Sequence, residues 1–143
     1  MDISAMTRNC TAQPMNRVKL TRIAYNKLRF MFDGQVGVID FDKHDFEETG
    51  CTFGQADGLV NKALEVEGVR MAVLASERDD GIKMSLRAVE PDTVNDIAVL
   101  FGGGGHAQAA GCTIHAPLHE ALDQVLAAMK DKLDKTPRPE GRV

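Results

Sequence analysis

The sequence has few cysteines, no long apolar run and no excess of positive charge, and each shortage argues against a class of protein. Cys10, Cys51 and Cys112 are an odd number without C-x-x-C spacing, which argues against a disulfide framework and a zinc knuckle. No window approaches about 18 consecutive apolar residues, and no basic segment leads into an apolar one near Met1, so neither a membrane span nor a signal peptide is predicted. We therefore expect a cytoplasmic protein with reduced thiols and no membrane partner.

The balance of charge is slightly acidic, with a formal net charge of −4 and a pI near 5.5. Proteins that wrap long nucleic acids need many lysine and arginine contacts to phosphates, so this composition argues against that mode of binding. A small phosphate ligand held by a few residues is compatible with it. The 143 residues are enough for one domain with its own core.

The pattern along the chain predicts a domain between two polar ends. Residues 1–15 lack periodicity and are expected to form a disordered leader, and residues 135–143 a loose tail. Residues 16–34 are predicted to form a connector helix that Asn16 caps, because apolar residues recur there at three- and four-residue spacing. The apolar positions of this helix are Leu20, Ile23, Ala24, Leu28 and Met31. Residues 35–134 are expected to form the domain itself.

Within the domain, short β-branched runs alternate with helical segments. Residues 35–41 predict a strand. Residues 42–50 predict a short acidic helix, since Asp42 and Asp45 have the spacing of a capping box. A further helix is expected over residues 55–68.

The second half of the chain combines strands and helices in the same way. The pattern predicts a hairpin across Asp80-Gly81, a helix with Pro91 and Asp92 at its start, a strand over residues 112–116 and an amphipathic helix over residues 118–133. Because the hairpin requires an antiparallel pair among interleaved strands and helices, we predict an α/β fold: a mixed β-sheet containing an antiparallel hairpin, with helices packed on it.

The most unusual stretch is FGGGGHAQAAG, residues 101–111. A run of glycines lets the chain turn sharply and lets a ligand approach the peptide N–H groups, which together can bind an anion. The HAQAAG segment can supply one short helical turn whose N-terminus favours an anion further. Neither a Walker loop nor G-x-G-x-x-G spacing is present, and a flexible connector is the alternative interpretation. The small residues after His106 indicate close packing against a neighbour.

The predicted strand IKMSLRA, residues 82–88, carries polar residues on one face. Lys83, Ser85 and Arg87 lie two apart and share that face, while the apolar residues between them point to the core. A guanidinium fixed on a strand can grip a phosphate in a bidentate fork; a solvated surface arginine is the alternative. His106 can donate to the same anion or serve a structural role.

These two stretches carry a resemblance to a known family. FGGGGHAQAAGCTI resembles the G-G-G-H-x-x-A-A-G signature of the DHHA1 domain, the C-terminal domain of DHH-family phosphoesterases. EGVRMAVLASERDDGIKMSLRA resembles the strand pair that carries the Ser-x-Arg of that domain. The similarity extends from about residue 16 to about residue 133. In overall pattern the sequence is most similar to the oligoribonuclease and phosphoadenosine phosphate phosphatase members.

The resemblance implies a division of labour between two domains. In such enzymes an N-terminal DHH domain holds two divalent ions, typically manganese, which activate the attacking water. The DHHA1 domain holds nucleotide phosphate and sugar at the other end of the substrate. The substrate-binding residues carried over to this chain are Arg87, Gly103, Gly104, Gly105 and His106, with Ser85 as a further candidate. The expected partners are a short RNA or nucleotide phosphate and an N-terminal DHH domain.

The chain departs from the family pattern because it contains no Asp-His-His triplet. The acidic residues around His44 are spread over several faces of a short helix, and capping accounts for them. His115 and His119 are separated by Pro117 and do not form a helical zinc pair. We therefore predict no metal site and no catalytic residue in this chain, and no appreciable hydrolysis by the chain alone.

Several functions are compatible with the resemblance. The first is the nucleotide-binding domain of a metal-dependent phosphodiesterase that acts on short oligoribonucleotides or on a 3',5'-bisphosphorylated nucleoside. RecJ-type single-strand exonucleases and cyclic dinucleotide phosphodiesterases contain the same domain. A free-standing RNA-binding module is another alternative, because a related domain closes the C-terminus of alanyl-tRNA synthetases.

Overall fold

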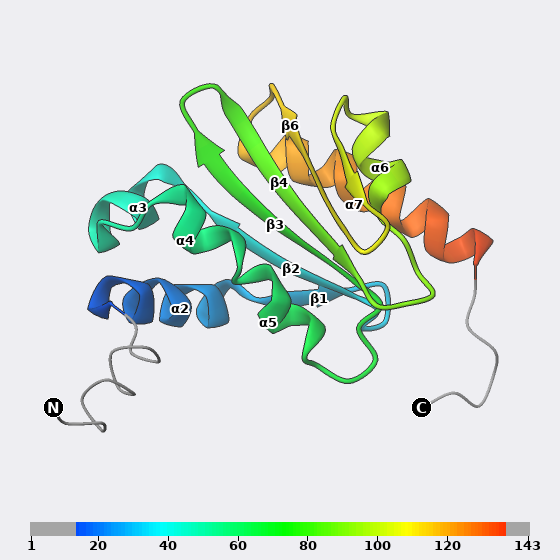
Figure 1. Cartoon of the computed structure of the whole chain (residues 1–143), viewed down its shortest axis with the longest axis horizontal. Helices are drawn as coiled ribbons and strands as arrows, with labels where there is room; N and C mark the ends of the chain where they lie inside the picture. The colour runs from blue at the N-terminus through cyan, green and yellow to red at the C-terminus, as the bar shows by residue number, and fades with distance from the viewer. Residues whose placement is uncertain (1–13, 137–143) are drawn as a thin grey trace, which may run out of the picture.

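The chain is built around a six-stranded mixed sheet, which Figure 1 shows at the centre of the molecule. The computed structural model describes residues 14–136. In spatial order the strands are β1 (Arg29–Met31), β2 (Val36–Phe41), β3 (Met71–Arg78), β4 (Gly81–Ala88), β6 (Ala109–Ile114) and β5 (Gly104–His106). β2 and β3 run parallel, and all other neighbouring strands run antiparallel. The predicted α/β fold with a mixed sheet is confirmed.

Helices cover both faces of the sheet and give each face its own buried core. One face carries α2 (Met15–Lys27), α3 (Lys43–Thr49), α4 (Phe53–Asp57) and α5 (Val60–Leu64); the other carries α6 (Asn95–Leu100) and α7 (Leu118–Lys135). In Figure 1 the first group lies in front of β2 and β3 or beside them, and α7 crosses behind the sheet. Within residues 14–136 no helix is long and apolar enough to cross a lipid bilayer.

β4 divides its side chains between the two faces as the alternation predicted. Its apolar residues lie in the core beneath α6 and α7. Lys83, Ser85 and Arg87 therefore point to the face that carries α2 to α5. On that face the buried core draws its strand residues from β2 and β3 and, within the described residues, none from β5 or β6. The β4–β6–β5 side of this face is consequently left open beside the helices.

The expected connector helix is shorter than predicted. α2 ends before Arg29–Met31, which form the edge strand β1. The cap position is occupied by Pro14, and Asn16 lies inside the first turn. Leu20 and Ala24 are fully buried in the core between α2 and the sheet. The helix is thus packed against the domain over much of its length.

Two boundaries in the middle of the chain also differ from the prediction. The segment 55–68 does not form one helix, because α4 and α5 are separated at Gly58-Leu59; glycine is a poor helix former in an interior position. The β3–β4 loop consists of residues 79–80, since Arg78 pairs with Gly81 across the hairpin. The turn is therefore one residue earlier than the predicted Asp80-Gly81 position.

The helix expected from Pro91 begins only at Asn95. Asp92 has a different role from the one predicted: its carboxylate pairs with the buried guanidinium of Arg70, with 2.7 Å between Nη2 and Oδ1. A buried guanidinium is costly unless it is paired in this way. Most of the predicted leader, and the predicted tail after Thr136, lie outside the described residues.

α3 begins with the capping box that the sequence predicted. The Asp42 carboxylate accepts a hydrogen bond from the Asp45 N–H (2.9 Å), and the Asp45 carboxylate accepts one from the Asp42 N–H (3.0 Å). The bond from the Asp45 N–H holds the pKa of Asp42 below its usual value, although partial burial opposes the shift, and the nearby Lys27 charge supports it.

Replacing Asp42 with alanine is expected to lower the free energy of unfolding at neutral pH by about 0.5–2 kcal/mol, because an N-cap hydrogen bond is lost. Since the pKa of Asp42 is lower in the folded state, its carboxylate contributes stability above its unfolded-state pKa. That contribution is lost as pH falls through the folded-state pKa. Urea unfolding of both proteins at neutral pH and in acid checks this. A difference of equal size at both pH values would contradict it.

Candidate functional site

The segment after the glycines forms a β-hairpin and not the short helical turn expected from the sequence. β5 and β6 pair antiparallel, with His106 opposite Ala109, and β6 pairs with β4 along its whole length. The loop of the hairpin is held by two backbone hydrogen bonds: Val94 N–H to the Ala107 carbonyl (2.7 Å) and Ala88 N–H to the Gln108 carbonyl (3.1 Å). Hydrogen bonding to β4 on one side and β5 on the other holds the small residues of β6 in an extended strand.

The glycines of the run serve different purposes. A Cβ at Gly103 would lie 2.1 Å from the Gly111 carbonyl oxygen, and one at Gly105 would lie 2.6 Å from the Ala110 Cα. Both positions therefore need glycine because β6 approaches them closely. A Cβ at Gly104 would meet no atom within 4 Å. Gly104 is thus the glycine of these three whose bare backbone faces open space.

Cross-strand pairing places four of the six predicted site residues in two rows on the open face. Ser85 pairs with Gly111, which pairs with Gly104. Arg87 pairs with Ala109, which pairs with His106. Residues directly opposite each other in neighbouring strands point to the same face of the sheet. Both rows consequently have a polar side chain on β4 and a very small residue on β6.

The small residues of β6 make room between the flanking strands. Arg87 and His106 are separated by two strand spacings, about 9–10 Å between their backbones, with only the methyl group of Ala109 between them. Gly111 likewise leaves space that the Lys83 side chain uses, because a Cβ there would lie 2.6 Å from Lys83 Nζ. The small residues of β6 thus leave a space above that strand, between the side chains of β4 and those of β5.

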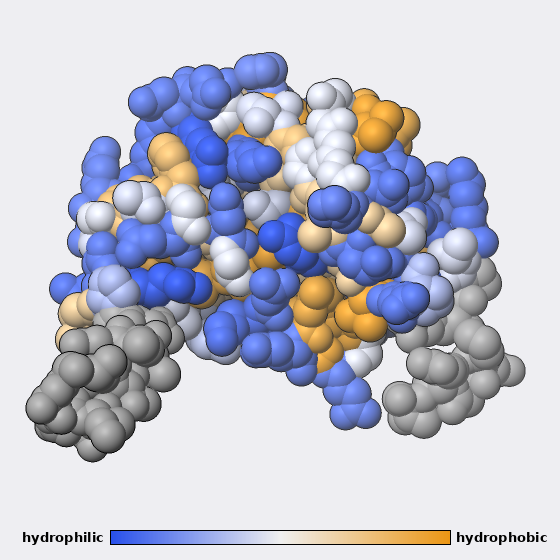
Figure 2. All heavy atoms as spheres, viewed as in Figure 1, coloured by the Kyte–Doolittle hydropathy of each residue, from blue (hydrophilic) through white to orange (hydrophobic). Residues whose placement is uncertain are grey.

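A hollow of about 240 Å³ occupies this place. It is lined by Asp57, Lys83, Ser85, Arg87, Gly104, Gly105, Ala109, Ala110 and Gly111. In the space-filling view of Figure 2, the surface over β4 and the β5–β6 hairpin is mainly blue and white, in keeping with charged residues and glycine. The hollow is open to solvent on the face left uncovered by α4 and α5.

The hollow carries an excess of positive charge. Within the described residues, no carboxylate oxygen lies within 4.0 Å of the Lys83 ammonium or the Arg87 guanidinium. Arg87 Nη1 donates to its neighbouring carbonyl, that of Leu86, at 2.9 Å. Burial raises the pKa of the Cys112 thiol on the opposite side of β6, although the Lys83 charge opposes this shift. The thiol therefore adds no negative charge near the hollow at neutral pH.

The acidic residue of the hollow, Asp57, is held by two neighbours. Its Oδ1 lies 3.5 Å from Arg78 Nη2 and accepts a hydrogen bond from the Ser85 hydroxyl, also at 3.5 Å. Asp57 is the last residue of α4, which a Thr52–Gln55 capping box begins. The carboxylate is thereby placed beside the middle of β4, at the level of Ser85.

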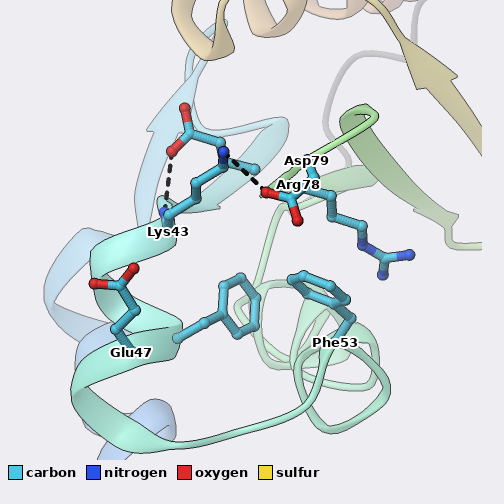
Figure 3. Close-up of a pocket in the computed structure, with 7 residues that line it drawn as sticks. Lys43, Glu47, Phe53, Arg78 and Asp79 are labelled. Atoms are coloured by element: carbon cyan, nitrogen blue, oxygen red, sulfur yellow. Dashed lines mark hydrogen bonds and ion pairs between the residues drawn. The ribbon is translucent and has the colours of Figure 1, made fainter.

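A second hollow, of about 170 Å³, lies next to the first and is drawn in Figure 3. Phe53 is one of its lining residues, and the Arg78 guanidinium carbon lies 4.4 Å from the centre of that ring. Lys43 and Asp79 form an ion pair of 3.0 Å across its rim. Figure 3 shows the Arg78 guanidinium pointing away from this pair, and Arg78 reaches Asp57 in the first hollow. Acidic residues outnumber basic ones in the lining of this second hollow, which contains Glu47, Glu77 and Asp79 beside Lys43 and Arg78.

Four of the six predicted site residues, Ser85, Arg87, Gly104 and Gly105, line the first hollow. Gly103 lies against β6, and His106 is exposed in the same row as Arg87, beyond Ala109. The other lining residues were not predicted as site residues, and Lys83 was placed only on the correct face of its strand; the remaining ones are Asp57, Ala109, Ala110 and Gly111. The two-residue spacing to Ser85 was the signal for Lys83. No comparable signal marks Asp57, which comes from a helix distant in sequence.

The described residues form an α/β domain whose open sheet face carries Lys83 and Arg87, neither with a carboxylate partner within residues 14–136, beside the small residues of β6. The family model of the DHHA1 domain matches residues 21–135. The chain belongs to the DHHA1 domain family.

Curated relatives support this assignment. The chain is 35% identical over 134 residues to the bifunctional oligoribonuclease and PAP phosphatase NrnA of Thermus thermophilus, covering 93% of this chain and 40% of that protein. It is 29% identical over 116 residues to the protein of the same name from Bacillus subtilis, covering 81% of this chain and 36% of that one. The chain therefore spans less than half the length of these relatives.

A solved structure shows the same fold. An exopolyphosphatase-related protein from Bacteroides fragilis matches with a TM-score of 0.82 at 24% sequence identity, over 94% of this chain and 40% of that one. At this identity the likeness concerns the arrangement of helices and strands.

Proposed function

We propose that the chain is the substrate-binding domain of a metal-dependent DHH-family phosphodiesterase that acts on short oligoribonucleotides or on a 3',5'-bisphosphorylated nucleoside. In this role the hollow between β4 and the β5–β6 hairpin holds a nucleotide phosphate. The names of the two curated relatives support this substrate class.

The proposal rests mainly on two cations, Lys83 and Arg87, which have no carboxylate partner among residues 14–136 and lie beside the small residues of β6. Lys83 and Arg87 project from one strand into the hollow, and the small residues of β6 leave space in front of them. Unpaired cations favour an anion, and the planar guanidinium of Arg87 can donate two parallel hydrogen bonds to phosphate oxygens. His106 stands at the far end of the Arg87 row, where it can donate to the same ligand from the other side.

The residues described here do not provide a site for the manganese ions of such an enzyme. Within residues 14–136, no group of three or more histidine, cysteine, aspartate or glutamate residues could hold a metal ion. In the proposal the metal ions belong to an N-terminal DHH domain, which supplies the activated water. The role of this chain is to bind and orient the substrate, which lowers the entropic cost of the reaction.

Turnover assays with manganese and a dinucleotide test the proposal. We expect no appreciable hydrolysis by the 143-residue chain alone and hydrolysis by a longer protein that joins it to a DHH domain. The coding region upstream of Met1 is expected to encode an Asp-His-His triplet. An inactive longer protein would count against the proposal.

A further inference from the structure

We infer that Asp57 is a specificity-determining residue that accepts a hydrogen bond from a sugar hydroxyl of the bound nucleotide. The inference rests on the proposed function, because it concerns the same hollow. It assigns the phosphate to the row of Arg87 and His106 and the sugar to the neighbouring row, in which Asp57 contacts Ser85, and so sets the orientation of the ligand.

Asp57 is the one acidic residue among those that line the hollow. A phosphate next to this carboxylate would be repelled, whereas the Arg87 guanidinium attracts one. A hydroxyl group carries a proton that a carboxylate can accept, and such a bond to a charged acceptor is stronger than one between neutral groups. The wall of the hollow that Asp57 forms therefore favours a neutral donor.

Asp57 lies beside the middle of β4, in the row next to that of Arg87. Its Oδ1 accepts from the Ser85 hydroxyl, and Ser85 lies two residues, about 7 Å along the strand, from Arg87. The carboxylate is thus one row away from the row in which Arg87 and His106 face each other across Ala109. A ligand whose phosphate lies in the Arg87 row extends its next group toward Asp57.

The Asp57 carboxylate is both accessible to solvent and in contact with neighbouring side chains. The Asp57 side chain is 37% exposed, so part of the carboxylate is accessible to a ligand. Arg78 holds the same Oδ1 that Ser85 approaches. These contacts fix the side chain in the hollow before a ligand arrives, which reduces the entropy lost on binding.

The hollow is small and open to solvent. Pockets that enclose drug-sized ligands usually have volumes of about 300–1,000 Å³, and this hollow has about 240 Å³. Part of a nucleotide bound there would extend beyond it. The base then lies outside, and the group that reaches Asp57 is a hydroxyl of the sugar.

The test is a calorimetric titration of the 143-residue chain with adenosine 5'-monophosphate and with its 2'-deoxy and 3'-deoxy forms. We expect one of the deoxy forms to bind about tenfold more weakly than the ribonucleotide, because a hydrogen bond to a charged group is lost. The form that loses affinity identifies the hydroxyl. In Asp57→Ala the three ligands should bind with nearly equal affinity, and Asp57→Asn, which keeps the size of the side chain, should retain a reduced preference.

A matched control is Asp79→Ala, which removes a carboxylate from the second hollow and should leave the preference unchanged. The Arg87→Ala variant distinguishes a failure of the proposed function from a failure of the role assigned to Asp57. If the wild-type chain binds none of the three ligands, or if Arg87→Ala leaves their affinities unchanged, the proposed function fails. If Arg87→Ala weakens all three but the wild-type chain binds them equally, or Asp57→Ala keeps the preference, the proposed function survives and the assignment of Asp57 is wrong.

Discussion

Replacing Arg87 with alanine is expected to weaken the binding of a nucleotide phosphate by more than tenfold while the domain stays folded. The guanidinium has no carboxylate partner among the described residues and makes one hydrogen bond, to the Leu86 carbonyl, so its removal leaves no buried charge behind. Loss of a charge-assisted hydrogen bond costs about 1.5–3 kcal/mol in binding, which corresponds to a tenfold weakening or more. Calorimetric titration with adenosine 3',5'-bisphosphate measures the affinity, and circular dichroism measures the fold.

His106→Ala is expected to have a similar effect on affinity, because His106 faces Arg87 across Ala109. The exposed side chain makes the variant well suited to the test, since little packing is lost. Arg22→Ala is the matched control: it removes one positive charge from an exposed position on α2, far in sequence from the hollow. Unchanged affinity in both Arg87→Ala and His106→Ala would refute the assignment of the phosphate to this place.

The second large effect concerns two adjacent glycines that differ in their surroundings. Gly103→Ala is expected to destabilise the domain by about 1–3 kcal/mol or more, because overpacking forces the backbone to shift. The new Cβ would lie 2.1 Å from the Gly111 carbonyl oxygen and 2.7 Å from the Cys112 Cβ. Gly104→Ala should leave stability unchanged or raise it by up to about 1 kcal/mol, since nothing lies within 4 Å of its Cβ. Urea unfolding of the two variants checks the contrast.

For the affinity of the domain for nucleotide phosphate, a substitution at Gly104 is the more useful test. Gly104→Val keeps an ordinary backbone conformation, since Gly104 does not have a positive φ, but it places a branched side chain in the hollow. We expect a folded protein with weakened affinity for nucleotide phosphate. If Gly104→Val were to bind as well as the wild type, the open backbone at this position would have no role in ligand approach.

The parts of the fold that were predicted correctly are those in which local pattern determines structure. The two-residue alternation of β4 placed Lys83, Ser85 and Arg87 on one face, and that face is the open one. The capping box at Asp42 and the following glycine defined α3 closely. In both cases neighbouring residues in the sequence carry the information.

The parts that were missed depend on distant neighbours. The alanine-rich composition of HAQAAG is compatible with a helical turn, yet this segment forms the loop and the second strand of the β5–β6 hairpin, because β6 pairs with β4. Tertiary context overrides local propensity here. Asp92 pairs with Arg70 across the fold and does not start a helix. Asp57 reaches the hollow only because α4 lies over the sheet next to β4. Local spacing contains no information about such contacts.

Binding of a nucleotide phosphate between β4 and the β5–β6 hairpin can be observed directly by titrating the ¹⁵N-labelled chain with adenosine 3',5'-bisphosphate and following the amide chemical shifts. We expect saturable shifts concentrated at Ser85, Arg87, Gly104, Gly105 and His106, and their loss in Arg87→Ala. Saturable shifts centred on Phe53 and Lys43 in the second hollow, or no shifts at all, would contradict it.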